Sequence, residues 1–560
     1  MLLLPERRGI QMMSFRRMTC FVLFIVLAGC SSGTASAAVS STSSASASAS
    51  GDKRAITIAM DADLNTMDYE VATDGGSFTM QEMCMAGLVQ IDENGQPQPD
   101  LAESWEISED GLTYTFHLRK GLKWSNGEPL TAADFVFGWQ RLADPDLASE
   151  YNFLETTIGV VNASEVISGE ADKSELGVEA PDDSTFVVHL SQPCGFMMSL
   201  MGFPSLFPLN EAFYESEGDS YAQSVYDLLY CGPYLMTGWE TGNQYTFTKN
   251  PEYWDADHTQ VETVVFKFLQ DTQSAMLEFQ SGNIDVVQLA SEQVDAYKDA
   301  EGFTQVLAAY SWRLDYNYDL EMLQNKDLRE AIFKGIDRTA IAENVLKDGS
   351  IAAKGFIPEQ FAFGPDGKDY RETAGNLVDE NVEEAQAAYE RAKEALGKDV
   401  TLTLLFEDSE ACRAVAENLQ QQLETNLPGI TINLDSKPKK TRLELMNKHE
   451  YEIGLTRWGP DYADPQTYLD LYKSDMPGYT GSYQNEKYNA VMNRAETGED
   501  AADAEARWAD LIEAEKILME DYAICPIYQN GRAMMINPDI GGIYYLMVGG
   551  APYRHMYFKN

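Results

Sequence analysis

Basic residues are scarce in this sequence of 560 residues. It has 41 lysines and arginines against 89 aspartates and glutamates, which gives a formal net charge of −48. Nucleic-acid binding requires Lys and Arg gathered on one face to neutralise phosphates, so the composition argues against a nucleic-acid partner. It equally argues against adsorption of the folded chain to an anionic membrane. The acidity is explained by solubility and indicates no acidic functional patch.

Motifs of the common catalytic and metal sites are also lacking. The five histidines are scattered along the chain, and His449-Glu450 lacks the second histidine of a zinc-protease helix. Asp61-Ala-Asp63-Leu-Asn65 lacks the glycine and the glutamate that complete a calcium loop. No GxSxG, phosphate-loop or GxGxxG motif occurs. The sequence therefore predicts no enzyme, no metal and no cofactor.

Cysteines are few and form no CxxC pair or zinc-ligand spacing, although seven occur. Cys20 and Cys30 fall in the N-terminal segment. An exported chain can hold a disulfide, and Cys194 and Cys231 are the candidate pair. At least one of the remaining cysteines would then stay free.

A long apolar run is lacking as well. The run Phe21–Ala28 has eight residues, too short to span ~30 Å of hydrocarbon. With Arg16 and Arg17 before it, this run predicts a secretory signal. The Leu-Ala-Gly-Cys sequence ending at Cys30 resembles the lipobox of bacterial lipoproteins. That resemblance implies removal of the signal peptide, a diacylglyceryl lipid on Cys30 and a place on the extracytoplasmic face of the cell membrane; an ordinary signal peptide is the alternative.

Residues 31–50 lack both charge and bulk. They are nearly all Ser, Ala, Thr and Gly. Such a segment cannot bury enough apolar surface to order itself, so it predicts a flexible tether between lipid and folded body. The roughly 510 residues that follow exceed the size of a single core and predict two or three domains.

Strand-like and helix-like segments alternate after the tether, which predicts an α/β or mixed α+β multidomain fold without a transmembrane segment. Runs rich in β-branched and aromatic residues predict strands at 114–118, 185–190, 264–269, 401–406 and 430–434. Apolar residues at helical spacing predict helices at 381–396 and 504–519. Thr131 and Asp134 predict a capping box before a third helix, whose apolar face consists of Phe135, Val136, Trp139 and Leu142.

Ten sequence blocks follow one another over most of the chain. They are Pro99–Trp105, Tyr114–Phe137, Arg141–Pro145, Gly232–Tyr234, Lys249–Trp254, Gly282–Asp285, Leu328–Ile332, Ile336–Arg338, Trp458–Pro465 and Pro526–Tyr528. With these blocks in this order, residues 56–560 resemble the oligopeptide-binding proteins of ABC importers, family 5 of the extracellular solute-binding proteins. The resemblance implies a two-lobed periplasmic-binding-protein-like fold of three domains. Domain I would comprise 51–87, 205–308 and 524–560, domain II 88–204, and domain III 309–523.

The resemblance also implies a ligand site. Asp461 is similar to the carboxylate that pairs with a peptide's α-ammonium; without the resemblance, a turn residue is the simpler interpretation of this Asp/Pro-rich loop. Trp458, Gly459 and Pro460 resemble the strand that pairs with the peptide backbone, and core packing is the alternative for Trp458. Further expected ligand residues are Thr73 and Asp74 from lobe one, Tyr310 and Trp312 near the domain boundary (core packing being equally expected), and Tyr151 and Asn152.

The chain departs from some relatives in two respects. Those relatives have a cysteine at the position of Gly459, bonded near the position of Tyr310, and this chain has neither. Basic residues for the peptide's carboxylate are not recognisable, which leaves Lys439, Lys440 and Lys448 as candidates.

The expected function is capture of oligopeptides by a monomer and their delivery to the permease of an ABC transporter. The alternatives are the same fold with another ligand (dipeptide, nickel chelate, haem, oligosaccharide or signalling peptide), an exported hydrolase, and a surface receptor or adhesin.

Overall fold

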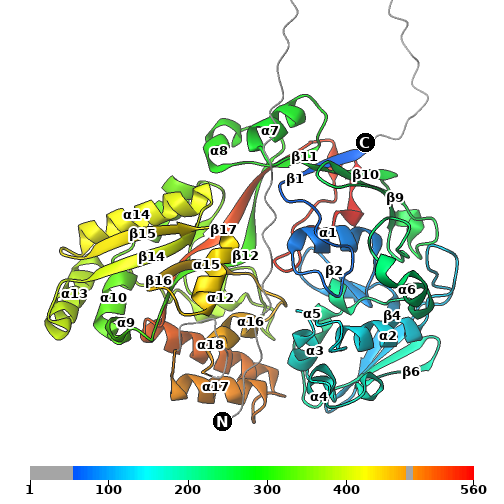
Figure 1. Ribbon diagram of the computed structural model, residues 1–560, viewed down its shortest axis with the longest axis horizontal. Coiled ribbons are helices and arrows are strands. Elements are labelled where there is room, and N and C mark those ends of the chain that lie inside the picture. Colours follow the sequence, from blue (N-terminus) through cyan, green and yellow to red (C-terminus); the bar gives the residue numbers. More distant parts are fainter. Residues whose placement is uncertain (1–54, 475–482, 560) are drawn as a thin grey trace, which may run out of the picture. The chain divides into compact units, whose positions relative to one another are not determined.

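Two large hydrophobic cores organise the chain. The computed structural model describes residues 55–474 and 483–559. One core gathers side chains between 56 and 286 with a few from 534–556 and with Tyr462, and the other gathers side chains between 309 and 528. We call the parts around these cores lobe one and lobe two (Figure 1). The expected mixed α/β fold with two lobes is confirmed, while Cys30, the signal peptide and the tether lie outside the described residues.

A mixed sheet runs through both lobes. Its strands, in spatial order, are β15 (Thr431–Lys437), β14 (Thr401–Glu407), β16 (Ile453–Trp458), β12 (Phe303–Tyr316), β17 (Ile524–Ile536), β11 (Val286–Gln288), β1 (Ile56–Met60), β10 (Thr263–Phe268), β9 (Gln244–Lys249) and β8 (Tyr234–Glu240), with β13 (Ile351–Ala352) on β17. β14 pairs in parallel with β15 and β16, and β1 pairs in parallel with β10 and β11. The predicted strands at 264–269, 401–406 and 430–434 are confirmed as β10, β14 and β15.

β12 and β17 carry the chain between the lobes. They are antiparallel and unusually long, and their register shifts between Leu307 and Ser311. The first half of β12 is half-exposed, whereas its second half is buried on both faces within lobe two. α7 (Thr272–Gln280) and α8 (Ser291–Tyr297) lie beside the outer ends of these strands (Figure 1). The arrangement places a bulged two-stranded ribbon at the junction of the lobes.

Lobe one contains a separate antiparallel sheet. Its order is β4 (Ala102–Ile107), β5 (Thr113–Leu118), β7 (Thr185–His189) and β6 (Val178–Asp182), so the strands predicted at 114–118 and 185–190 are confirmed. The predicted helix after Thr131 is α2 (Ala132–Leu142), and its capping box is present. Phe135, Trp139 and Leu142 are buried in the core of this lobe, as their spacing predicts.

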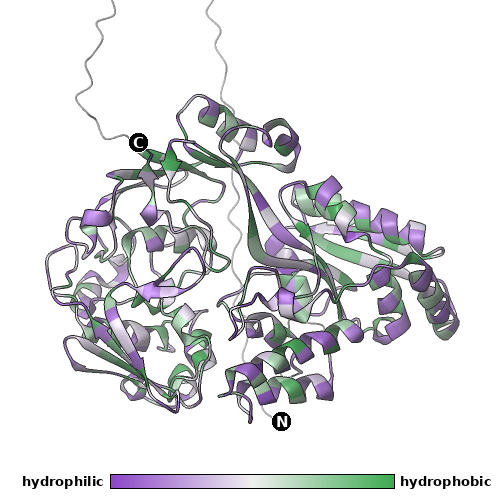
Figure 2. Cartoon of the chain, turned by 180° about the vertical axis from the view of Figure 1, so that it is seen from behind, coloured by the Kyte–Doolittle hydropathy of each residue, from purple (hydrophilic) through white to green (hydrophobic). Residues whose placement is uncertain are grey.

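Helices cover both faces of the sheet in lobe two. They are α9 (Glu321–Gln324), α10 (Lys326–Lys334), α11 (Arg338–Ala340), α12 (Tyr370–Ala374), α13 (Val382–Leu396), α14 (Glu410–Asn426), α15 (Lys439–Asn447), α16 (Gln466–Leu469), α17 (Glu486–Glu496) and α18 (Ala504–Glu520). The helices predicted at 381–396 and 504–519 are thus α13 and α18. α13 buries Ala385, Ala388, Tyr389 and Ala392 and turns a polar face outward (Figure 2).

The remaining elements belong mainly to lobe one. They are α1 (Gly75–Cys84), α3 (Phe153–Ile158), α4 (Ala163–Ile167), α5 (Met197–Leu200) and α6 (Glu211–Glu217), with the ladders β2 (Val89–Ile91)–β3 (Pro97–Pro99) and β18 (Ile540–Gly541)–β19 (Tyr557–Phe558). Across the two described stretches, no helix is long and apolar enough to cross a membrane.

The expected disulfide between Cys194 and Cys231 is absent. Both thiols are free and buried, as are the other three described cysteines. The Cys231 thiol donates to the carbonyl of Ala86, whereas Cys194 lies where its carbonyl accepts from the Tyr114 hydroxyl. The two cysteines therefore occupy different parts of the lobe-one core, and that prediction was wrong.

Candidate ligand-binding site

Asp461 lies in the loop after β16 and faces lobe one. Its carboxylate accepts a hydrogen bond from the hydroxyl of Tyr151, which lies 310 positions away in the chain, at 3.4 Å. Burial raises the pKa of Asp461 to about 6, although the Tyr151 hydrogen bond lowers it. No ion pair among the described residues involves Asp461. The loop therefore presents a half-buried, partly desolvated carboxylate that has no ion-pair partner among the described residues.

Tyr151 is fixed in lobe one by other aromatic rings. It stacks on Phe203 with 5.4 Å between ring centroids, and Phe78 meets it edge-on at 5.4 Å. The half-buried Asn152 precedes α3 and makes no side-chain cap there. Tyr151, which we expected to face the ligand, thus lies beside Asp461, and the contact between these two side chains was not part of the sequence prediction.

The segment Trp458–Pro460 continues β16 toward this loop. Trp458 pairs with Ser311 of β12, and its indole N–H donates to the Thr467 hydroxyl at 3.4 Å. The half-buried Trp458 ring also packs on the lobe-two core. The ladder between β14 and β16 ends at Gly454, so beyond it the named strands leave one edge of β16 without a partner strand. The backbone groups on that edge are the kind that an extended peptide can join.

Gly459 is in close contact with Tyr310. A Cβ at this position would collide with the Tyr310 ring. Pro460 and Tyr310 line a small cavity of about 50 Å³. Trp312 is buried instead, with its ring stacked on Tyr528 at 5.5 Å and its N–H donating to Asn530. Of the two aromatic residues expected near the domain boundary, the structure brings Tyr310 to a cavity and Trp312 into the core.

The lobe-one segment expected to oppose this strand precedes α1. Thr73 is exposed. Asp74 caps α1, because its carboxylate accepts from the backbone N–H of Ser77 at 2.9 Å and from its hydroxyl at 2.8 Å. Its charge also acts on the Lys439 ammonium of lobe two. The cap gives Asp74 a structural role that sequence reasoning did not assign.

A basic cluster lies beside Tyr310. The Arg457 guanidinium is 3.1 Å from Glu407 and lies 4.9 Å from the Trp312 ring centroid. The buried Arg442 donates to the Thr456 hydroxyl at 2.6 Å and also faces Glu407, at 3.6 Å. Desolvation and the neighbouring Arg457 lower the pKa of Lys439.

This cluster was largely missed from the sequence. Arg442 and Arg457 both face the Glu407 carboxylate, and the charges of Glu407 and Asp74 act on Lys439. All three candidate lysines are exposed on or after α15, and the structure brings only Lys439 of the three to the cluster. Arg457 directly precedes the Trp458 motif, which is the signal that could have found it.

Two contacts join the lobes next to Asp461. Tyr462 comes from a lobe-two loop, but its ring is buried in the lobe-one core and stacks on Phe196 with 4.1 Å between centroids and an interplanar angle of 13°. The Arg507 guanidinium binds both oxygens of Asp464 at 2.8 and 2.9 Å and lies 5.8 Å from the Phe196 ring. These contacts hold the Asp461 loop against lobe one.

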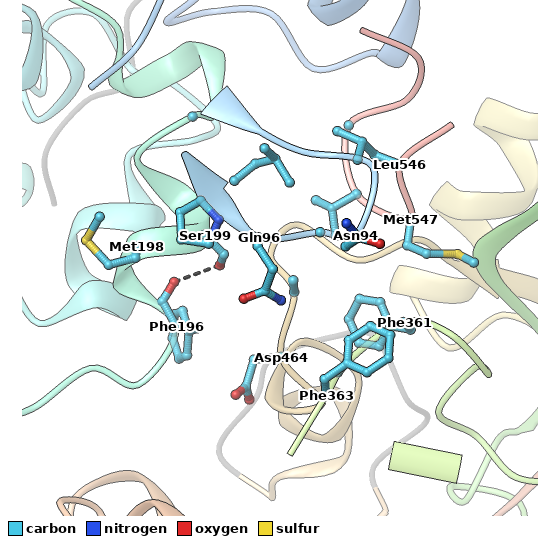
Figure 3. Close-up of a pocket in the computed structure, with 18 of the residues that line it drawn as sticks. Asn94, Gln96, Phe196, Met198, Ser199, Phe361, Phe363, Asp464, Leu546 and Met547 are labelled. Atoms are coloured by element: carbon cyan, nitrogen blue, oxygen red, sulfur yellow. Dashed lines mark hydrogen bonds between the residues drawn. The ribbon is translucent and has the colours of Figure 1, made fainter. Parts of the chain in front are cut away.

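A cavity of about 1000 Å³ opens between the lobes beyond this loop. Figure 3 shows Phe196 and Met198 on one side, Phe361 and Phe363 on another, and the Gln96 side chain pointing between them. Ala463 and Asp464, rather than Asp461, contribute the loop's part of the wall. The cavity belongs to the same cleft as Asp461 and is not the compartment that the site prediction described.

The known proteins to which this chain is similar are bacterial solute-binding proteins. The family model described as bacterial extracellular solute-binding proteins, family 5 Middle, matches residues 96–479. The chain is 30% identical to the periplasmic oligopeptide-binding protein OppA of Haemophilus influenzae, over 91% of this chain and 93% of that protein. Its fold is similar to a Bacillus anthracis oligopeptide ABC transporter substrate-binding domain (TM-score 0.77, 36% identity, 90% of this chain and 99% of that one). It is equally similar to Listeria monocytogenes OppA bound to peptide (TM-score 0.77, 31% identity, 91% and 100%).

Proposed function

The chain belongs to the bacterial extracellular solute-binding proteins of family 5, and from this we propose that it captures peptides between its lobes and delivers them to an ABC importer. Members of this family bind solutes for transport, so the chain is a binding protein and not an enzyme. Relatives named as oligopeptide- and dipeptide-binding proteins support a peptide as the solute. The division into domain I, domain II and domain III, with the bounds given above, is part of this proposal.

One observation carries the peptide assignment: Asp461 is a desolvated carboxylate with a hydroxyl and no cation beside it. A peptide brings the missing charge in its α-ammonium. At 4 Å and an effective dielectric of about 20, such a pair attracts by about 4 kcal/mol before desolvation is subtracted. Asp461 would thereby fix the position of the first residue whatever the sequence that follows.

The backbone of the peptide has its own partners in this proposal. In this proposal the peptide backbone joins the edge of β16 along which the ladder with β14 ends at Gly454, Trp458–Pro460 continue that strand beside the ligand, and Thr73 and Asp74 flank the ligand from lobe one. Tyr310 and Asn152 would border the first residues, while Trp312 acts through packing. Lys439 and Arg457 would attract the carboxylate end of a short peptide. Backbone recognition of this kind tolerates many side chains.

Transport requires that a permease distinguish the loaded protein. The contacts of Tyr151 with Asp461 and of Phe196 with Tyr462 join the lobes around the ligand position. A peptide that binds both lobes stabilises the closed arrangement by its preference for that state. The permease subunits would recognise the closed surfaces, and the importer would take the peptide from a monomer.

Location follows from the N-terminus in this proposal. Cys30 would carry the diacylglyceryl lipid, and residues 31–50 would tether the folded body to the extracytoplasmic face of the cell membrane. The lipobox and the composition of the tether support this anchoring. Globomycin-sensitive processing and loss of membrane association in Cys30→Ser would test it.

Native mass spectrometry tests the peptide assignment. Protein released gently from cells grown in peptide-rich medium should carry a heterogeneous set of intact peptides, which dissociate when the protein is denatured. Incubation with a defined peptide should then exchange that set for a single bound mass. Absence of any bound peptide, with failure of the defined peptide to bind, would overturn the proposal, and cleaved products would indicate a hydrolase instead.

A further inference from the structure

A loop between β18 and β19 reaches into the cleft. β18 and β19 pair through Ile540 with Phe558, so residues 542–556 leave and re-enter one ladder; we call them the cleft loop. Arg554 holds its returning limb to Asp100 of lobe one at 2.8 Å. The Tyr544 hydroxyl ties the outgoing limb to the carbonyl of Ile91 at 3.3 Å. The loop is therefore anchored at its base on lobe one.

The tip of the cleft loop bridges the two lobes. The N–H of Leu546 donates to the carbonyl of Gly550 at 2.7 Å, and this turn contains Gly549 at φ 93°, a conformation that favours glycine. Tyr545 packs on the lobe-one core, whereas Met547 and Val548 pack on the lobe-two core. The tip is consequently held from both sides.

This tip separates two spaces of different size. Tyr545, Leu546, Met547 and Gly549 line both the 50 Å³ cavity that contains Tyr310 and Pro460 and the 1000 Å³ cavity. We call the larger space the outer chamber. Figure 3 shows Leu546 and Met547 along one side of it, opposite Phe196 and Met198. The cleft loop is the common wall between the outer chamber and the space next to the Asp461 loop.

The lining of the outer chamber is apolar, with amides but little positive charge. Its large apolar and amide side chains include Phe196, Met198, Phe361, Phe363, Trp508, Met547, Asn94, Gln96 and Gln360. Arg554 is the one arginine or lysine of the described lining, and Asp100 neutralises it. The exposed Glu93 adds negative charge to the same wall, and Glu82 adds a carboxyl group whose pKa burial raises to about 7. Such a lining favours aromatic or aliphatic groups and disfavours carboxylates.

We propose that the outer chamber is a second ligand subsite, which takes uncharged aromatic or aliphatic residues downstream of the first residues of a bound peptide, and that the tip of the cleft loop is the specificity-determining wall between the two subsites. The inference rests on the proposed peptide function. What it adds to that function is a preference for longer peptides with apolar side chains at the C-terminal end over longer peptides with acidic side chains there. A chamber of this size accommodates more than one side chain.

Titration calorimetry on the mature protein, with endogenous peptides removed by unfolding and refolding, tests this preference. The probes are trialanine and two pentapeptides that continue trialanine with two phenylalanines or two glutamates. We expect the phenylalanine pentapeptide to bind at least about tenfold more tightly than the glutamate pentapeptide, because it buries aromatic surface and places no side-chain carboxylate against the acidic wall, whereas the C-terminal carboxylate is common to both peptides.

Two variants assign the preference to the chamber. Phe363→Ala removes a chamber side chain that is 45% exposed, and Tyr226→Ala is the matched control, because Tyr226 is 86% exposed and lines neither cavity. Phe363→Ala should weaken the phenylalanine pentapeptide by about fivefold or more and leave trialanine within about twofold. Glu93→Lys should improve binding of the glutamate pentapeptide, and Tyr226→Ala should change nothing.

The outcomes separate this inference from the function on which it rests. If no probe binds, trialanine included, the peptide function itself fails. If trialanine binds but the two pentapeptides bind equally, the outer chamber is not a subsite. The inference would also be overturned if Phe363→Ala weakened trialanine and the phenylalanine pentapeptide equally. The same holds if Tyr226→Ala weakened the phenylalanine pentapeptide as much as Phe363→Ala did.

Discussion

Replacing Phe196 by leucine should loosen the contact between the lobes while each lobe keeps its fold. Phe196 is 6% exposed and Tyr462 is 3% exposed, although the two rings come from different lobes. Opening the cleft would expose both. The leucine keeps part of the apolar burial but loses the stacked pair, which is worth about 0.5–1.5 kcal/mol beyond burial, and it leaves a partly unfilled space.

The magnitude follows from these two contributions. A total of about 1–2 kcal/mol shifts the open-to-closed ratio by about 5- to 30-fold toward the open state. Because only the closed state grips the ligand from both sides, the apparent affinity for trialanine should fall by up to the same factor. Trialanine is the suitable probe, since it is too short to depend on the outer chamber that Phe196 also lines.

Small-angle X-ray scattering and calorimetry measure the two effects. The ligand-free Phe196→Leu protein should have a larger radius of gyration than wild type, and excess peptide should restore the compact value. Phe186→Leu is the matched control, because Phe186 is fully buried in the same core and meets Phe135 and Trp139 within lobe one. It should lower the melting temperature without changing scattering or affinity. Unchanged scattering and affinity in Phe196→Leu, or equal changes in both variants, would refute the reasoning.

Three further predictions concern single groups. Burial raises the pKa of Asp461 to about 6, and protonation removes the charge that an α-ammonium needs. The affinity for a peptide should therefore be retained at pH 7 and fall about tenfold by pH 5. An affinity that calorimetry finds unchanged between these pH values would contradict this. Gly459→Ala should lower stability by about 1–3 kcal/mol in denaturant unfolding through collision with Tyr310, and Tyr310→Ala should relieve that loss; additive losses would refute the contact. In a protein that starts at residue 51, a thiol reagent should label five cysteines, and only after unfolding, since all five are free and buried. Labelling of only three cysteines in the unfolded protein would show that the other two form a disulfide.

Local patterns made much of the fold predictable. α13 carries apolar residues at helical spacing and begins at its Asn381 cap, and β10 is a run of β-branched and aromatic residues. Both elements are determined by their own side chains and by burial of one face. The ordered sequence blocks added the two-lobed arrangement, which no local period contains.

Features that depend on contacts between residues far apart in the sequence could not be predicted from local patterns. The cleft loop has no period, and its course depends on the pair of Arg554 with Asp100, 454 positions apart. The basic cluster brings together Glu407, Arg442 and Arg457 from three different elements, so no spacing of residues in the sequence predicts it. The expected pairing of Cys194 with Cys231 failed for the same reason, because separation along the chain does not report distance in the fold.

The central claim is that Asp461 holds the α-ammonium of a peptide, and calorimetry with a free and an N-acetylated trialanine tests it most directly. In wild type, acetylation should weaken binding at least about 30-fold, because it leaves a desolvated carboxylate without its cation. In Asp461→Asn, which keeps the shape of the side chain, the free peptide should lose a similar factor and acetylation should matter little. Wild-type affinity of Asp461→Asn for the free peptide, or full discrimination against the acetylated peptide in that variant, would contradict the account.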